Sequence, residues 1–289
     1  MPAPRRIVLV HAHPDDETIT SGGLMARAVD AGVGVTLVTC SLGELGEVIP
    51  PDLKHLEGRP ELAEHRAGEL AAACAALGVT DHRFLGGRGR WVDSGMVSAG
   101  RGILAAAPAH LSSGAFADRA EVDLQVAQLA DVLTEVDPDV VVSYDAAGGY
   151  GHPDHVRAHE IAGGAVEKLD PLGERIALWA TAAARGEVAA GLESLRRRPW
   201  LPLPVPTVED LPTVPDETIT VRLALGPARV RKLAALRAHA TQIQVFDDGS
   251  EPPAYALSNE LAQPVLASEG FVLLRGPSGA DEALEALSA

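Results

Sequence analysis

Residues 5–11 read Arg-Arg-Ile-Val-Leu-Val-His, and residues 34–40 read Gly-Val-Thr-Leu-Val-Thr-Cys. Both runs are dense in aliphatic and β-branched residues, as expected of strands that are buried on both faces. Between them, the spacing of the apolar residues predicts a helix over 20–31. A strand, a helix and a second strand in this order are typical of a βαβ unit, and therefore of a parallel sheet.

The same alternation continues along the chain. Further helices are predicted at about 60–77, 121–136 and 153–168, and further strands near 82–85, 139–144 and 175–181. We therefore expect an α/β fold with a Rossmann-like, mostly parallel sheet flanked by helices. The stretches 41–58 and 86–118 show little periodicity, and loops of this length inside a compact domain are usually functional.

A change of composition near residue 198 indicates the domain organisation. The chain from Pro199 to Pro215 is rich in Pro, Leu and Val, which favours an extended connection. Beyond it we predict a strand at 217–223, a helix at 227–240 and a last strand at 270–275. Residues 1–198 are thus expected to form the Rossmann-like domain, and residues 199–289 a smaller C-terminal α/β unit that packs near the active site.

Composition excludes several classes of protein. The net charge of -16 argues against nucleic acid, because a phosphate backbone is bound by clustered Lys and Arg. The two cysteines, Cys40 and Cys74, are too few for a disulfide framework and suit a reducing cytoplasm. Since no apolar run is long enough for a membrane span, we expect neither a transmembrane segment nor a signal peptide. A small molecule is therefore the expected partner, and homo-oligomer formation stays open.

Two motifs about 140 residues apart, by count along the numbering, carry the candidate chemistry. They read His-Ala-His-Pro-Asp-Asp-Glu at 11–17 and Tyr-Gly-His-Pro-Asp-His at 150–155. Each follows the carboxyl end of a predicted parallel strand, which is where ligands bind in open α/β sheets. Each motif also offers two potential metal ligands three residues apart, His13 with Asp16 and His152 with His155. Two nitrogens and one oxygen around a divalent metal leave room for water, as in a catalytic zinc site.

Simpler interpretations exist for each motif alone. The acids after His13 could form a solvated loop that caps the next helix, and a lone histidine pair is more often solvated or buried in a core. His11 alternates with His13 along the strand and should point to the opposite face. Gly22 and Gly23 indicate close helix packing, since no Gly-x-Gly-x-x-Gly fingerprint of a dinucleotide-binding protein follows the first strand. Together, the two motifs favour metal binding.

The residues His13 to Glu17, combined with His152 to His155, resemble the zinc-dependent N-acetylglucosaminyl deacetylase family, which includes the deacetylases of the glycosylphosphatidylinositol pathway. Further segments resemble the branch of this family that acts in mycothiol biosynthesis: Thr39-Cys40, Glu44 to Val48, Gly89-Arg90-Trp91, Asp93-Ser94-Gly95-Met96 and Gly148 to Gly151.

The resemblance implies a role for each matching residue. It implies one zinc ion per chain, with Fe(II) as an alternative, held by His13, Asp16 and His155. It also implies that Asp15 is the general base, that His152 stabilises the oxyanion with Asp154 as its orienting partner, and that Tyr150 polarises the carbonyl. Glu47, Arg66 and Asp93 match positions that contact the sugar and the inositol.

The implied activity is hydrolysis of the N-acetyl group of N-acetylglucosaminyl-inositol in mycothiol biosynthesis. Two enzymes of the same family are alternatives, namely a mycothiol S-conjugate amidase and a deacetylase of another N-acetyl sugar. A non-catalytic glycan or metal sensor on the same scaffold is a further alternative. Whether Asp15 or His152 protonates the leaving amine stays open at this point.

Overall fold

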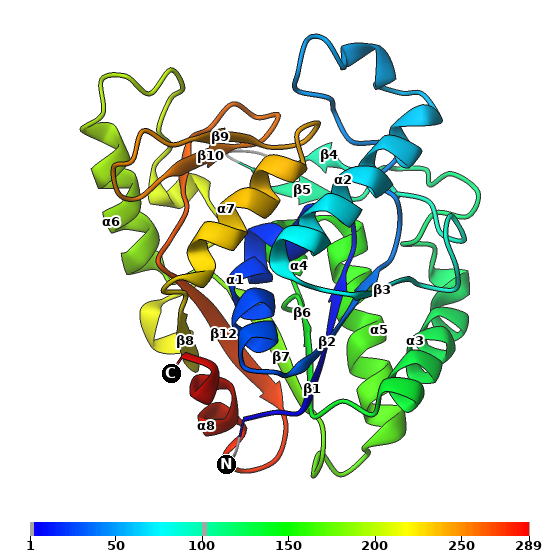
Figure 1. The fold of residues 1–289 in the computed structure, drawn as a ribbon. Coiled ribbons are helices and arrows are strands. Elements are labelled where there is room, and N and C mark those ends of the chain that lie inside the picture. Colours follow the sequence, from blue (N-terminus) through cyan, green and yellow to red (C-terminus); the bar gives the residue numbers. More distant parts are fainter. Residues whose placement is uncertain (1–2, 100–102, 289) are drawn as a thin grey trace.

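A seven-stranded sheet runs through the centre of the molecule, in the strand order β3-β2-β1-β6-β7-β12-β8 (Figure 1). This computed structural model describes residues 3–99 and 103–288. Five neighbouring strands are parallel: β3 (Asp81–Phe84), β2 (Gly34–Thr39), β1 (Arg6–His11), β6 (Val140–Ser143) and β7 (Ala177–Ala182). The predicted Rossmann-like α/β fold is thus confirmed.

Helices cover both faces of the sheet (Figure 1). On one face lie α1 (Asp16–Asp30), α2 (Glu61–Leu77), α7 (Ala228–Ala238) and α8 (Ala280–Glu285), and they bury residues such as Leu24, Leu70 and Leu284. On the other face lie α3 (Val122–Val136) and α5 (Pro153–Leu169), which bury Leu129 and Ile161. Burial of apolar surface on both faces explains why the central strands are almost entirely apolar.

The part of the chain after residue 198 contributes two strands to the main sheet. Strand β12 (Ser268–Arg275) pairs antiparallel with β7, and β8 (Val221–Ala224) pairs antiparallel with β12, so both extend the main sheet. A small second sheet, β11-β10-β9, lies above one end of the main sheet (Figure 1). Its strands are β9 (Gln244–Phe246), β10 (Ala254–Ala256) and β11 (Gln263–Pro264). The C-terminal part therefore shares the central sheet with the rest of the chain.

The remaining elements are short or lie at the rim. Helix α6 (Arg185–Arg196) follows β7, and α4 (Gly148–Gly151) precedes α5. Strands β4 (Val97–Ser98) and β5 (Ala105–Ala106) pair within the stretch 86–118 that was expected to be irregular. Short 3₁₀ helices lie at Lys54–Leu56, Arg119–Glu121, Val208–Asp210, Asp216–Thr218 and Ala286–Ser288. Among the described residues, no helix combines the length and apolar character that a membrane span requires.

Candidate metal centre

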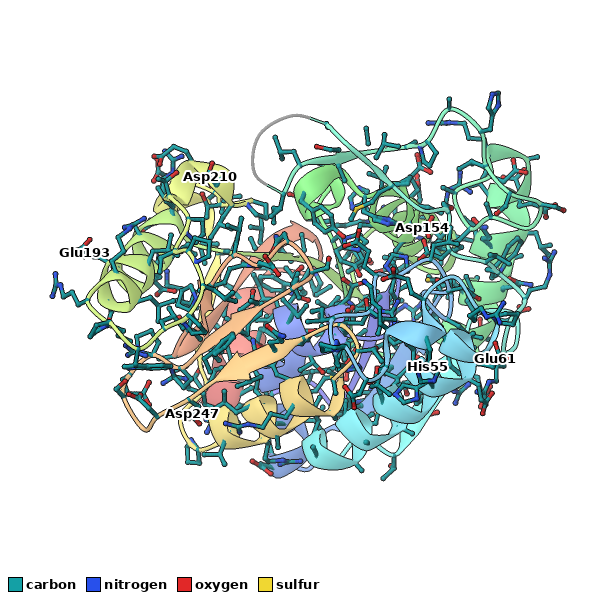
Figure 2. The ribbon with its side chains drawn as sticks, turned by 90° about the horizontal axis from the view of Figure 1, so that it is seen from above. His55, Glu61, Asp154, Glu193, Asp210 and Asp247 are labelled. Carbon is teal, nitrogen blue, oxygen red and sulfur yellow. The ribbon has the colours of Figure 1, made fainter. Side chains whose placement is uncertain are left out.

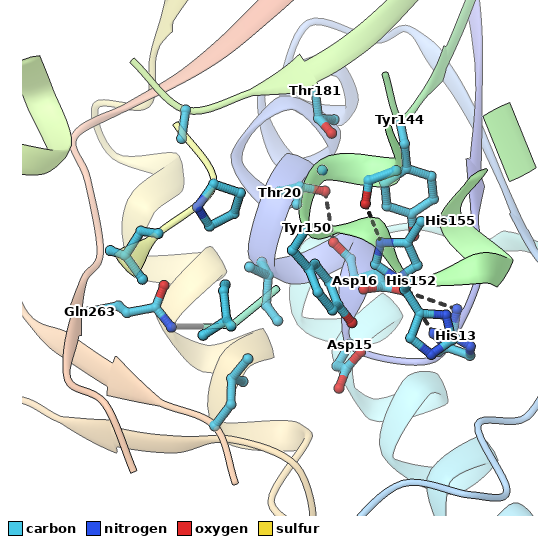
Figure 3. A pocket seen from close by; sticks show the side chains of 18 of the residues that line it. His13, Asp15, Asp16, Thr20, Tyr144, Tyr150, His152, His155, Thr181 and Gln263 are labelled. Atoms are coloured by element: carbon cyan, nitrogen blue, oxygen red, sulfur yellow. Dashed lines mark hydrogen bonds and ion pairs between the residues drawn. The ribbon is translucent and has the colours of Figure 1, made fainter. Parts of the chain in front are cut away.

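The sheet topology brings the two motifs together. Strands β1 and β6 are parallel neighbours, with Ile7 opposite Val140 and Leu9 opposite Val142. The chain leaves β1 toward β2 on one side and reaches β6 on the other, so the strand order reverses between them. Such a reversal opens a crevice at the carboxyl ends of the strands. Both motifs follow these two strands, and their side chains meet there (Figure 3).

The side chains of the three predicted ligands lie close together around the carboxylate of Asp16. The Oδ2 atom of Asp16 lies 3.3 Å from Nδ1 of His13 and 3.3 Å from Nε2 of His155. Asp16 is the first residue of α1, and His155 lies in the first turn of α5, which Pro153 opens with His152 as its N-cap. All three predicted ligands are buried. The structure therefore brings the side chains of two remote segments together at one place.

The hydrogen bonds of the two histidines leave one nitrogen of each available for a metal. Nδ1 of His155 lies 3.2 Å from the carbonyl oxygen of Gly148, to which it donates, and its Nε2 has no hydrogen-bond partner among the described residues. Nε2 of His13 lies 3.1 Å from the carboxylate of Asp154. A histidine that binds a metal through one ring nitrogen normally donates the N–H of the other to a carboxylate or a carbonyl oxygen. The two remaining lone pairs face Asp16, so the donor set fits a divalent metal.

Additional donors surround this point. Nitrogen atoms of His13, His152 and His155 lie within 4.8 Å of one another, and His13 forms a second group of this size with Asp93 and Asp154. However, Nδ1 of His152 already accepts the backbone N–H of Asp154, at 3.1 Å. The set of His13, Asp16 and His155 therefore stays a prediction, with His152 beside it.

Asp15 has a different environment from the adjacent Asp16. It is the N-cap of α1 and has a φ of 114°. Burial raises the pKa of its carboxyl, Arg66 opposes this rise, and Asp16 and Glu17 add to it, giving a value of about 7. A carboxylate whose pKa lies near neutrality suits the exchange of protons with water.

His152 and Tyr150 lie on the same side of the site. Burial, His13 and His155 lower the pKa of His152 to about 2, so its ring is neutral. Because Nδ1 accepts a backbone N–H, the proton of the neutral ring is on Nε2, which can donate to an oxyanion. The ring of Tyr150 lies edge-on to His155, with 5.0 Å between the ring centroids. Burial raises the pKa of Tyr150, which keeps its hydroxyl a donor.

The position of Asp154 differs from the expectation that it orients His152. Its Oδ2 atom lies 3.1 Å from Nε2 of His13 and accepts the backbone N–H of Ser94 at 3.0 Å. Only its backbone N–H contacts His152. The reason is geometric, since Asp154 follows the N-cap of α5 and its side chain is fully buried (Figure 2). Asp154 thus supports a metal ligand directly.

The three predicted substrate contacts all line one cavity of about 820 Å³ that also contains the metal ligands. Glu47 is exposed at its rim. Arg66 is buried, donates to the carbonyl oxygens of Gly43 and Pro14, and lies 3.3 Å from Asp15. Asp93 is buried, and its Oδ1 lies 3.5 Å from Nε2 of His13. Arg66 and Asp93 therefore also shape the electrostatics of the metal centre.

Sequence reasoning missed Tyr144. Its ring stacks on His155, with 4.1 Å between centroids, and its hydroxyl accepts the backbone N–H of Ala12 at 2.9 Å. Its place at the end of the predicted strand 139–144 was the available signal. His11 contacts Ser21 and Tyr144 and lies outside the ligand set, as expected. A Cβ atom on Gly23 would lie 2.2 Å from Leu225, so the predicted close packing at this glycine is confirmed.

An open α/β sheet with a His-Asp-His site and an adjacent buried carboxylate is the arrangement that a metal-dependent hydrolase uses. Comparison with known families agrees. The chain belongs to the PIG-L family, described as GlcNAc-PI de-N-acetylase, whose model matches residues 8–166.

Relatives match almost the whole chain. A protein of Actinosynnema mirum is 48% identical over 278 residues, covering 96% of this chain and 94% of the relative. A protein of Saccharomonospora viridis is 49% identical, covering 95% of this chain and 97% of the relative. Both are named 1D-myo-inositol 2-acetamido-2-deoxy-alpha-D-glucopyranoside deacetylase.

Solved structures share the fold. A deacetylase of teicoplanin biosynthesis, in complex with teicoplanin, has a TM-score of 0.55 at 18% identity, with 93% of this chain and 98% of that chain covered. N,N'-diacetylchitobiose deacetylase from Pyrococcus horikoshii has a TM-score of 0.51 at 20% identity, with 82% and 70% covered. These likenesses support the fold assignment.

Proposed function

We propose that this enzyme hydrolyses the N-acetyl group of N-acetylglucosaminyl-inositol, releasing acetate and glucosaminyl-inositol for mycothiol biosynthesis. The observation that carries the proposal is the match over at least 95% of the chain to relatives named for this deacetylation. The site supports it, since a metal centre and a buried carboxylate are the parts that amide hydrolysis requires.

The proposed metal is zinc, one ion per chain, held by His13, Asp16 and His155. Two imidazoles and one carboxylate also suit Fe(II), which is the alternative. When bound, such an ion lowers the pKa of a coordinated water and polarises the amide carbonyl as a Lewis acid.

The protein side chains supply the proton transfers. In this proposal Asp15 accepts a proton from the attacking water, supported by its pKa of about 7. Nε2 of His152 and the hydroxyl of Tyr150 donate to the oxygen on which negative charge develops. A C–O bond forms, the C–N bond breaks, and the amine leaves with a proton. We assign that proton to Asp15, which in this proposal has taken it from the attacking water.

The partner in this proposal is the small glycoside. Glu47, Arg66 and Asp93 are its proposed contacts, supported by their place on the cavity wall. A cytoplasmic site of action remains part of the proposal, supported by the buried free thiols of Cys40 and Cys74.

The proposal is tested by measuring amine release from three substrates: N-acetylglucosaminyl-inositol, free N-acetylglucosamine and a bimane conjugate of mycothiol. We expect the highest kcat/KM for the first, together with about one metal equivalent per chain by elemental analysis. Faster cleavage of the conjugate would favour the S-conjugate amidase instead. Absence of turnover of all three by metal-loaded protein would favour the sensor.

A further inference from the structure

We infer that His239, acting through Glu17, is a positioning residue that holds the backbone of Asp15 in place for catalysis. The inference rests on the proposed function, in which Asp15 is the general base. Both Glu17 and His239 have no exposed surface, and neither lines the cavity. The contact that joins them to the site is the one between Glu17 and the backbone N–H of Asp15.

The contacts form a short chain from the C-terminal part of the molecule to the site. Nε2 of His239 lies 2.7 Å from Oε1 of Glu17. The other carboxylate oxygen, Oε2, accepts the backbone N–H of Asp15 at 2.8 Å. The hydroxyl of Thr18 also donates to Oε1, at 2.5 Å. Each oxygen of Glu17 thus has its own partner, which fixes the plane of the carboxylate.

The backbone of Asp15 needs such a restraint. Its φ of 114° and ψ of -37° lie in a region that L-residues rarely adopt. Strained conformations of this kind persist only where the surroundings hold them, and they concentrate at functional sites. Arg66 restrains the side chain, since its guanidinium lies 3.3 Å from Oδ2 of Asp15. Glu17 restrains the peptide group, and His239 restrains Glu17.

His239 is itself anchored by the turn that follows α7. The backbone N–H and the hydroxyl of Thr241 donate to Glu69 of α2, at 2.8 Å and 2.6 Å. The side chain of Gln242 donates to the carbonyl oxygen of Glu47, at 3.0 Å. This turn therefore connects α1, α2 and the loop that carries Glu47, and it gives His239 a fixed position.

Loss of His239 removes one of the partners that orient the Glu17 carboxylate. The carboxylate can then rotate away from the N–H of Asp15, and the strained peptide can relax. A displacement of about 1 Å in a catalytic group costs up to about 10²-fold in rate. The side chain of Asp16, which adjoins Asp15 and Glu17 in the chain, keeps its contacts with His13 and His155, and neither histidine is bonded to Glu17 or His239. We therefore expect the metal to be retained.

Three variants test this inference. His239→Leu removes the contact with Glu17, whereas His239→Gln offers an amide N–H at a similar reach. Thr241→Val is the matched control. It removes the hydroxyl contact of this turn with Glu69 but keeps the backbone N–H contact that holds the turn, and both partners of the His239–Glu17 contact remain. For each variant, kcat, KM, metal content and the midpoint of thermal unfolding are measured with N-acetylglucosaminyl-inositol.

We expect His239→Leu to lower kcat by about 10- to 100-fold with KM within about threefold of the parent. His239→Gln should recover most of the lost kcat, and all three variants should keep their metal. Thr241→Val should lower the midpoint without lowering kcat. The inference is overturned if folded His239→Leu keeps the parent kcat, if Gln does not rescue it, or if Thr241→Val lowers kcat equally.

A readout without substrate separates this inference from the proposed function. If the parent does not turn over any N-acetylglucosaminide, the proposed function fails. Hydrogen exchange of the segment 14–18 still reports the restraint, because the N–H of Asp15 is protected by Glu17. Faster exchange there in His239→Leu than in Thr241→Val supports the restraint, and equal rates exclude it.

Discussion

Asp15 and Asp16 carry the same side chain at adjacent positions, yet the structure gives their carboxyl groups opposite properties. Although burial opposes its ionisation, His155 and His13 hold the pKa of Asp16 well below its usual range. Burial instead raises the pKa of Asp15 to about 7. Neighbouring acids whose pKa values are pushed apart commonly divide two roles between them. Here Asp16 suits metal binding, and Asp15 suits proton transfer.

Asp15→Asn tests the proton-transfer role. The amide keeps the size of the side chain but cannot accept a proton, so we expect kcat to fall by about 10²- to 10⁴-fold. Metal content should equal that of the parent, because Asp15 lies outside the ligand set. Elemental analysis and steady-state kinetics check both statements. A variant with half of the parent kcat would remove Asp15 from the mechanism.

Comparison of His155→Ala with His152→Ala distinguishes a metal ligand from a hydrogen-bond donor to the oxyanion. His155→Ala should lose the metal, since its free Nε2 faces Asp16. His152→Ala should keep the metal and lose about 10²- to 10³-fold in kcat, as is common for a positioned donor to an oxyanion. Metal content of the purified proteins decides the assignment. Equal metal content in both variants would show that the ligand set is wrong.

Asp154→Ala tests the contact that differs from the sequence-based expectation. Because the carboxylate accepts from His13, its loss should weaken metal affinity by about 10- to 100-fold. Metal retained against a competing chelator is the measurement, with His152→Ala as the control. If Asp154 acted by orienting His152, both variants would lose turnover and hold the metal with parent affinity.

At the scale of elements, a buried ion pair joins α1 to α7 and β12. Nζ of Lys232 lies 2.7 Å from Oε1 of Glu269 and also donates to the carbonyl oxygen of Ile19. The carboxylate of Glu269 accepts the backbone N–H groups of Gly23 and Leu24, each at 2.8 Å. The helix that begins at the metal centre is therefore fixed from two elements of the C-terminal part.

Lys232→Met should destabilise the protein by about 3–5 kcal/mol, because it leaves the charge of Glu269 buried without its partner. Replacing both residues, as Lys232→Met with Glu269→Gln, should cost less than the sum of the single changes. Denaturant unfolding of the single and double variants measures this coupling. Additive effects would mean that the two side chains do not stabilise each other.

Prediction of elements from the sequence succeeded where local pattern decides the structure. The apolar β-branched runs identified β1 and β2, and Pro153 after His152 correctly placed the start of α5. The helix expected over 20–31 instead begins at Asp16, because its first turn is acidic and carries no apolar periodicity. The strands β9 to β11 are two or three residues long, which leaves no alternation to detect.

The residues of the site could likewise be predicted only where a local sequence pattern marks them. The two motifs contain every proposed ligand, because His-Pro-Asp patterns after strands are local features, and the family resemblance selected His13, Asp16 and His155 among their residues. The contacts of Asp154 with His13 and of His239 with Glu17 span 141 and 222 residues and depend on tertiary packing. No local pattern reports which of two nearby histidines a buried carboxylate will face.

At the scale of the whole molecule, the site depends on both ends of the chain. The cavity that contains His13 and His155 is also lined by Glu187, Val265 and Gly270. Both parts of the chain also contribute to the central sheet, because β12 and β8, which follow residue 198, continue it beyond β7. We therefore propose that residues 1–198 and 199–289 fold as one unit, although the composition changes at their boundary.

A chain truncated after residue 198 tests this proposal. It would lose the antiparallel partner of β7 and several fully buried side chains, among them Leu223, Phe271 and Leu284. Each such side chain contributes about 1.5–3 kcal/mol, so a few of them together approach the 5–15 kcal/mol by which a typical domain is stable. The truncated chain should therefore fail to fold. It should also aggregate, because the edge of β7 becomes exposed.

Circular dichroism and the solubility of fragment 1–198 measure this outcome, with co-expression of fragment 199–289 as the control. If the two parts form one sheet, co-expression should recover soluble protein that binds metal, since β12 can then pair with β7. A fragment 1–198 that unfolds cooperatively and binds zinc alone would instead show an independent domain. The pairing of Val272 with Ala180, and of Phe271 with Thr181, would then be a docking contact between separately stable units.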